Sequence, residues 1–286
     1  SDPERCEAIL RIARERLDGE LARDGEGRDH VQEALGGWVA QLFAGQGRPL
    51  LRGWLEEWAA EPIRYRTLLN AYASSLRGAF FNRYRRDAEQ GARDMCDRAQ
   101  AGLQTIVAQA VRISDEAYGV LSSDASEDDK KAASEEYTGA ERVLHHAMNQ
   151  LYFGAGANAR TEDSAGLPER AAMASFLADY AEMLALLEQS REPATLHHLI
   201  ELYEFLIPGD PTAVFEALYS ILLGRGEAEG YHHESLGNSA VVRIIRRYIA
   251  DHRTIFEDDG RRARLTEILH LFSEVGWTDA LELLYE

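Results

Sequence analysis

The sequence predicts an all-α fold, and three observations support this class. Apolar residues recur three and four positions apart along almost the whole chain. Strict alternation of apolar and polar residues over five or more positions is scarce. Only seven prolines occur in 286 residues, most of them at the edges of apolar segments, so long stretches are free to be helical. These patterns predict an irregular helical bundle that leads into helical-hairpin repeats, an α-solenoid-like arrangement.

The first 121 residues contain the longest uninterrupted helical patterns. Pro49 and Pro62 each stand where a first helical residue is expected, because proline has its backbone angle pre-set for that position. We expect helices over residues 8–25, 30–43, 49–58, 62–80 and 86–121. This N-terminal helical region is Arg-rich from residue 48 to residue 112.

Residues 122–136 read SSDASEDDKKAASEE and differ sharply in composition from what precedes them. The stretch has no large apolar side chain, so it cannot bury enough surface to order itself. We therefore expect an acidic linker or loop here. It would separate the N-terminal region, 1–121, from a C-terminal helical-repeat region, 137–286.

The C-terminal region has shorter helical patterns, separated by turns that contain Gly, Pro and Asp. We expect helices over residues 137–152, 168–187, 195–206, 212–223, 239–256, 262–273 and 278–285. Thr195 and Thr278 stand where an N-cap belongs, and Asp210 is placed to cap the helix that Pro211 begins. Helix–turn–helix units with short connections are typical of solenoids.

Two segments in the last ~90 residues carry a family resemblance. GDPTAVFEALYSIL resembles the turn and second helix of a HEAT-type repeat, and GWTDALELLYE is similar to half of a tetratricopeptide-type unit. The resemblance implies an architecture, an α-solenoid whose usual role is to bind other macromolecules.

Charge is distributed unevenly along the chain. The whole sequence carries 31 Lys+Arg against 49 Asp+Glu, a net charge of −18, yet the stretch 48–112 has 11 Arg against 7 acidic residues. Within it, four arginines alternate with aromatic residues, and the candidate binding residues are Arg77, Arg83, Tyr84, Arg85 and Arg86. Such a pattern suits nucleic-acid contact, but it also fits a solvated helix face or docking onto an acidic surface.

A second basic segment lies on the predicted helix Val241–Tyr248, which carries Arg243, Arg246 and Arg247. We expect Arg243 and Arg246 to contribute to a contact surface. The segment Arg247-Tyr-Ile-Ala-Asp-His252 resembles the Arg–His signature of HEPN-type all-α ribonucleases. That resemblance implies Arg247 and His252 as alternative catalytic residues, which contact the scissile phosphate and transfer protons. Four other Arg–His pairs have a comparable spacing, so the pattern does not single out one site.

Metal and cofactor chemistry has no comparable signal. Adjacent histidines occur at 145–146, 197–198 and 232–233, but neighbours on a helix point about 100° apart and cannot chelate a metal from one face. We predict no metal and no cofactor. Trp38, Trp54 and Trp58 fall in adjacent predicted helices, and Trp54 and Trp58 share a helix face. We expect these three rings in the core, with a docking surface as the alternative for part of them.

The function predicted from these observations is that of a non-enzymatic helical-repeat interaction module. We expect a fragment of a larger bacterial sensor or scaffold protein, cytoplasmic and without membrane contact. Its partner would be another protein or other domains of the same parent chain. The alternative is an all-α nucleic-acid-binding or HEPN-like ribonuclease domain. Only two cysteines occur, which excludes a disulfide framework.

Overall fold

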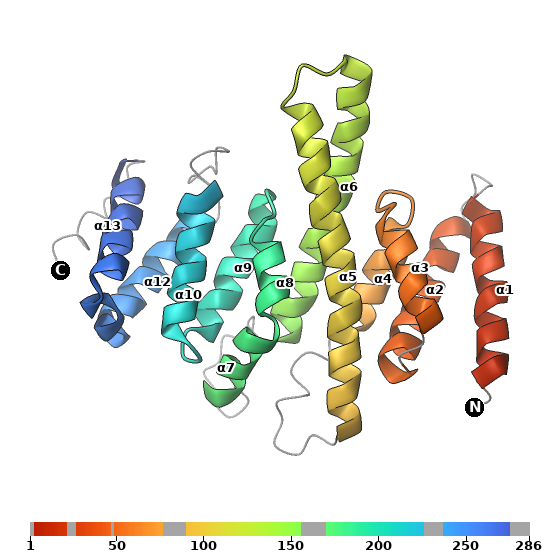
Figure 1. Ribbon diagram of the computed structural model, residues 1–286, viewed down its shortest axis with the longest axis horizontal. Helices are drawn as coiled ribbons and strands as arrows, with labels where there is room; N and C mark the ends of the chain where they lie inside the picture. Colours follow the sequence, from red (N-terminus) through yellow and green to blue (C-terminus); the bar gives the residue numbers. More distant parts are fainter. Residues whose placement is uncertain are drawn as a thin grey trace. The chain divides into compact units, whose positions relative to one another are not determined.

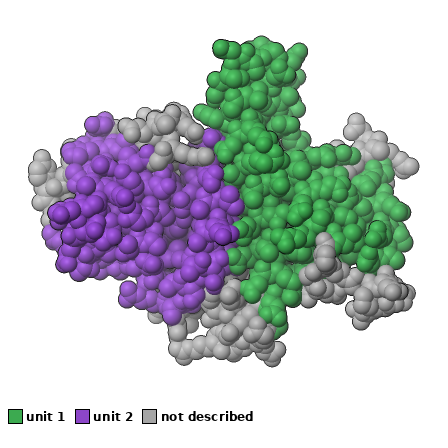
Figure 2. All heavy atoms as spheres, viewed as in Figure 1, with its two compact units in different colours: residues 1–83, 87–154 green, residues 84–86, 155–286 purple. Residues whose placement is uncertain are grey.

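A computed structural model describes residues 3–21, 27–46, 49–76, 90–155, 170–225 and 237–274. These residues form helices joined by turns and contain no strand, which confirms the all-α prediction (Figure 1). The chain divides into two compact units, coloured separately in Figure 2. Unit 1 comprises Ser1–Arg83 and Asp87–Gly154, and unit 2 comprises Tyr84–Arg86 and Ala155–Glu286.

Unit 1 is organised around a long helical hairpin. Its helices are α1 (Pro3–Leu21), α2 (Gly27–Gln46), α3 (Pro49–Ala59), α4 (Arg66–Ser75), α5 (Gln90–Leu121) and α6 (Glu127–Gly154). Helices α5 and α6 run side by side, and the end that they share extends past the other helices of the unit (Figure 1). The opposite part of the hairpin packs on α2, α3 and α4, and the core of unit 1 lies there.

The prediction of a loop at 122–136 is wrong for most of that stretch. Only residues 122–126 form a turn, and α6 begins at Glu127. The Ser126 hydroxyl accepts a hydrogen bond from the backbone N–H of Asp129 at 3.2 Å and donates one to the Asp129 carboxylate at 2.6 Å. Glu127, Asp128 and Asp129 also place negative charge at the positive end of the helix dipole. Capping and charge thus start a helix in a segment that lacks large apolar side chains.

The helix expected from Pro62 begins four residues later, at Arg66, because its cap comes from another helix. The Gln32 side chain of α2 is buried and accepts a hydrogen bond from the backbone N–H of Leu68 at 3.2 Å. The same amide donates to the carbonyl of Arg64 at 3.1 Å. The Tyr65 side chain, at the N-cap position, makes no capping bond. Gln32 of α2 therefore pairs with a free backbone N–H in the first turn of α4, the role that an N-cap side chain usually has.

Unit 2 consists of shorter elements. They are α7 (Arg170–Asp179), α8 (Ala181–Leu187), α9 (Pro193–Leu206), α10 (Pro211–Tyr219), the π-helix η3 (Ser220–Arg225), α12 (Gly237–Asp251), the 3-10 helix η4 (Arg253–Glu257) and α13 (Asp259–Glu274). The helix expected over 168–187 is divided at Tyr180, and the one expected over 239–256 ends at Asp251. The helix expected over 278–285 lies outside the described residues.

The two predicted caps of unit 2 that the structure describes have different outcomes. Asp210 caps α10 as expected, because its carboxylate accepts from the backbone N–H groups of Thr212 and Ala213 at 3.1 and 3.0 Å. Thr195 is not an N-cap. Pro193 occupies the first position of α9, which places Thr195 inside the first turn, where it is buried.

In unit 2, corresponding helices of two successive hairpins contact each other. Helix α9 packs on α10, and α12 connects to α13 through η4, which contacts both. Between these hairpins, α9 contacts α12 and α10 contacts α13 (Figure 1). The rings of Phe215, Tyr248 and Phe256 meet edge to face between them, with centroids 5.1–6.1 Å apart. First helices therefore pack on first helices and second on second, as in helical solenoids.

Candidate functional site

Two arginines of α12, Arg243 and Arg247, bind the same residue of α9 in the preceding hairpin. Arg243 donates from Nε and Nη2 to the two carboxylate oxygens of Glu204, at 2.7 and 2.5 Å. The Glu204 side chain is 19% exposed and that of Arg243 is 53% exposed, so the pair lies at the edge of the hairpin interface. The two parallel bonds join α12 to α9 in a bidentate geometry.

Arg247 reaches the same residue by a different group. Its Nη1 donates to the backbone carbonyl of Glu204 at 3.1 Å. Glu204 lies in the last turn of α9, where carbonyl groups have no partner within the helix. A guanidinium placed there satisfies one of these carbonyls and brings positive charge to the negative end of the helix dipole. Arg246, the remaining arginine of the predicted surface, is exposed.

The Arg247–His252 pair spans the end of α12 and does not lie within the helix. His252 is the residue between α12 and η4, and its ring meets the edge of Tyr248 with centroids 5.9 Å apart. Burial lowers the pKa of His252, and the positive charge of Arg247 lowers it further. The imidazole is therefore neutral at neutral pH, while the Arg247 guanidinium is directed to Glu204.

A second polar contact joins the other two helices of the stacked hairpins. Arg264 of α13 pairs with Glu216 of α10, and its guanidinium lies over the Tyr219 ring at 5.1 Å. The Tyr219 hydroxyl donates in turn to Glu267 at 2.6 Å. Sequence reasoning missed this cluster. The signal that indicates it is a three-residue spacing on each helix, since Glu216 and Tyr219 share one face of α10 as Arg264 and Glu267 share one of α13.

The Arg-rich segment predicted to bind a partner, with Arg77, Arg83, Tyr84, Arg85 and Arg86, lies outside the described residues. Elsewhere in the stretch 48–112, arginines interact with groups of unit 1. Arg98 donates to the carbonyl of Ala44 at 2.6 Å, and Arg112 donates to the Glu116 carboxylate at 2.8 and 2.9 Å.

The tryptophan pair lies mainly in the core, as expected. Trp58 is fully buried and its ring centroid lies 5.7 Å from that of Trp54. The Arg14 guanidinium of α1 lies 5.3 Å from both rings and forms an ion pair with Glu57. Helix α1 is thus attached to α3 by stacking and charge together. The expectation of a core position is wrong for Trp38, which is 52% exposed.

The histidine doublets do not build a metal site in the described residues, where no three His, Cys, Asp or Glu side chains group closely enough to hold an ion. His197 lies 3.7 Å from Glu201 on α9. His146 of α6 contacts the Ser74 hydroxyl and the Asn70 carbonyl of α4, at 2.9 and 3.0 Å. His232 and His233 lie outside the described residues.

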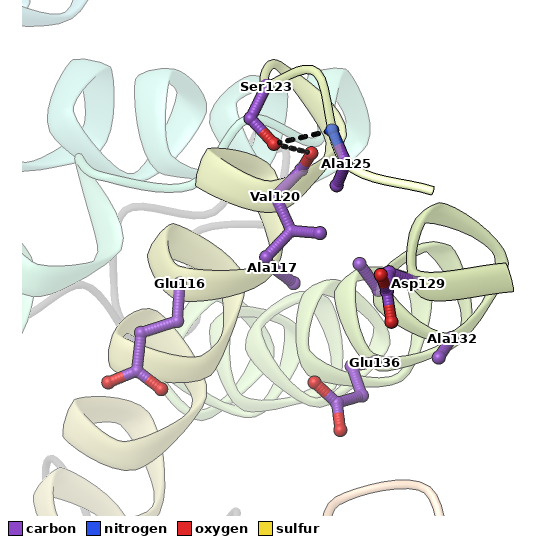
Figure 3. Close-up of a pocket in the computed structure, with 9 residues that line it drawn as sticks. Glu116, Ala117, Val120, Ser123, Ala125, Asp129, Ala132 and Glu136 are labelled. Carbon is purple, nitrogen blue, oxygen red and sulfur yellow. Dashed lines mark hydrogen bonds between the residues drawn. The ribbon is translucent and has the colours of Figure 1, made fainter. Parts of the chain in front are cut away.

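One surface pocket in unit 1 was not indicated by the sequence. It lies between the end of α5 and the start of α6 and has a volume of about 490 Å³ (Figure 3). The residues that line it are small, acidic or hydroxylic: Glu116, Ala117, Val120, Ser123, Ala125, Asp129, Ala132, Ala133 and Glu136. The expectation of a loop at 122–136 did not lead to it, because Asp129, Ala132, Ala133 and Glu136 line the pocket from the first turns of α6.

No family model, curated protein or solved structure matches the chain. Among the described helices, none combines the length and the apolar composition needed to cross a bilayer.

Proposed function

We propose that the chain is a non-enzymatic helical-repeat interaction module that binds a protein, either a separate partner or another domain of a longer parent chain. The observation that carries this proposal is the like-on-like stacking of α9 on α12 and of α10 on α13. Stacked hairpins present an extended surface with many side chains, which suits the recognition of another macromolecule. A module of this kind would act as a scaffold or as the binding arm of a sensor protein.

The arrangement of the polar side chains in unit 2 also supports a binding role. Arg243, Arg247 and Arg264 each bind a group on the neighbouring hairpin, and so contribute to the packing of the repeat. A catalytic arginine, by contrast, has to face its substrate. We propose Arg246, together with the exposed half of Arg243, as the contact surface on α12. Two cationic side chains one turn apart fit an acidic patch on a partner.

The ribonuclease alternative rests on His252. A neutral imidazole beside an arginine is the state that a general base requires at neutral pH, and the lowered pKa of His252 provides it. In this reading Arg247 would have to leave the Glu204 carbonyl to reach a phosphate.

Cross-linking in cells that express the parent protein tests the two functions together. A photoreactive residue next to Arg246 is expected to capture protein, and Arg246→Glu is expected to abolish that capture. Arg142→Glu, an exposed arginine of α6 in unit 1, serves as the charge-matched control and should leave it intact. Cross-links to RNA, with RNA cleavage that is lost in His252→Ala, would instead establish the alternative. An Arg246→Glu profile identical to the wild type would contradict the proposed surface.

A further inference from the structure

The pocket at the end of the α5–α6 hairpin is a groove with an apolar floor. Ala117 of α5 and Ala133 of α6 both line it and are 2% and 5% exposed. Val120 extends the floor from α5 (Figure 3). Ala132 and Ala125 border it on the α6 side. The small side chains leave about 490 Å³ open between the helices, a volume within the range of ligand pockets.

Three carboxylates are among the residues that line the same pocket. Glu136 and Asp129 come from α6 and Glu116 from α5, and all three are exposed (Figure 3). Glu116 is bonded to Arg112 and Asp129 to Ser126, whereas the described residues offer Glu136 neither a hydrogen bond nor an ion pair. Residues 112–136 carry eight acidic against three basic side chains, so the groove lies in a negative field.

The stability of α6 accounts for Asp129, which lies in its first turn and is bonded to Ser126, but not for Glu136 or Glu116. Favourable interaction with a helix dipole is confined to the first turn. Glu136 lies in the third turn of α6, and Glu116 is on a different helix altogether. Glu116 is paired with Arg112, which leaves Glu136 beside the apolar groove as the carboxylate that a cationic ligand could neutralise.

We propose that this groove binds an arginine side chain presented by a basic segment of a partner protein. An arginine has an apolar stem that matches the alanine and valine floor. Its planar guanidinium matches the carboxylates that line the pocket, and it donates to two oxygens at once. The inference rests on the proposed function and specifies the partner: the protein segment that binds the α5–α6 hairpin is basic. A nucleic acid, being an anion, does not fit here.

The test is a binding titration of the full chain with a fluorescently labelled, arginine-rich peptide of eight residues, followed by anisotropy. The wild type should bind, and a glutamate-rich peptide of the same length should not. Ala132→Trp fills the groove without changing its charge and should weaken binding on the order of tenfold. Glu136→Gln should weaken it about two- to fivefold, the scale of one exposed ion pair.

Two matched variants separate a groove from diffuse attraction. Glu135→Gln removes the same charge from the neighbouring residue, which does not line the groove, and Ala108→Trp adds the same ring at an exposed position of α5 outside it. Both should bind like the wild type, and circular dichroism checks that each variant is folded. If Glu135→Gln weakens binding as much as Glu136→Gln, or if Ala132→Trp has no effect, the groove is not the site. Absence of peptide binding at low ionic strength overturns the proposal as well.

Failure of this inference and failure of the proposed function give different results. If the cell cross-links contain protein but the peptide does not bind, the groove proposal fails alone. If the peptide binds in the expected pattern but no protein is cross-linked near Arg246, the chemistry of the groove is retained and the α12 surface is wrong.

Discussion

Helices α5 and α6 of unit 1 have 32 and 28 residues, whereas the longest described helix of unit 2, α13, has 16. The long hairpin of unit 1 packs on three further helices, α2, α3 and α4. In unit 2 the described hairpins contact each other pairwise through two parallel interfaces. Unit 1 is therefore held by one shared core, and unit 2 by a series of similar local contacts.

The side chain that joins α2 to α4 in unit 1 is more buried than the ion pairs that join the hairpins of unit 2. In unit 1 the buried amide of Gln32 binds two backbone groups of α4, where water has little access. In unit 2 the pairs Glu204–Arg243 and Glu216–Arg264 lie at the margins of the hairpin interfaces, where both partners are partly exposed. Buried polar groups contribute more to stability than exposed ion pairs do, since removing one partner leaves the other unsatisfied. Substitutions in unit 1 should accordingly have the larger effects.

The largest effect is expected for Trp58→Ala. This substitution removes a fully buried ring from the core of unit 1, as well as one of the two rings under Arg14. The free energy of unfolding of unit 1 should fall by about 3–5 kcal/mol, measured by denaturant titration with near-ultraviolet circular dichroism. Trp38→Ala, at a half-exposed position, should change it by less than about 0.5 kcal/mol. Equal effects at the two positions would mean that Trp58 is not part of the core.

Gln32→Leu should have the next largest effect. The leucine has a similar volume but leaves the N–H of Leu68 and the carbonyl of Arg64 without their partner. A loss of about 1–3 kcal/mol is expected, together with faster hydrogen exchange at the Leu68 amide. Gln41→Leu changes the same side chain at an exposed position of α2 and should be nearly neutral. Unchanged exchange at Leu68 would show that the amide does not cap α4.

The Glu204–Arg243 pair of unit 2 should contribute less. A double-mutant cycle with Glu204→Ala and Arg243→Ala is expected to give a coupling free energy of up to about 1 kcal/mol, because Arg243 is half exposed. The coupling should decrease between 0.05 and 1 M NaCl, about the range over which the screening length falls to ~3 Å. A larger, salt-independent coupling would remove the contrast drawn between the two units.

The all-α class followed from the sequence because the spacing of apolar residues is a local property that each helix carries by itself. Caps were predictable where cap and helix are adjacent, as at Asp210 and Pro211. The start of α4 was not, because Gln32 reaches it from 36 residues away. At Glu127 the loop was predicted from the polar composition alone, and the capping side chain of Ser126 was not considered.

The candidate site was less predictable for the same reason. Arg243 was expected on a contact surface, but its partner Glu204 lies 39 residues earlier, and no spacing rule connects them. The groove depends on four alanines from two helices and their turn, and alanine by itself carries no chemical signal. The sequence showed where charged residues concentrate along the chain. It did not show which of them form ion pairs, because that depends on how the helices pack.

The smallest expected effect concerns Glu188, a half-buried carboxylate of unit 2, and the dependence of stability on pH. Burial raises the pKa of Glu188, and the hydrogen bond from the Tyr203 hydroxyl, at 2.5 Å, opposes this in part. Since the pKa is higher in the folded than in the unfolded chain, the stabilising contribution of Glu188 is complete below the unfolded pKa. It is lost as the pH rises through the folded pKa. At pH 7 the partly buried charge of Glu188 therefore lowers the free energy of unfolding.

Glu188→Gln removes that charge and keeps an oxygen that accepts from Tyr203. The variant should be more stable than the wild type at pH 7, by less than about 1 kcal/mol, and the difference should disappear below pH ~4, where Glu188 is protonated. Tyr203→Phe removes the hydrogen bond that favours the carboxylate, so stability should fall more steeply above pH ~4 than in the wild type. Thermal melts between pH 3.5 and 8 measure both changes. The opposite result would be a stability difference, variant minus wild type, that is lower at pH 7 than at pH 4. It would show that folding stabilises the Glu188 carboxylate.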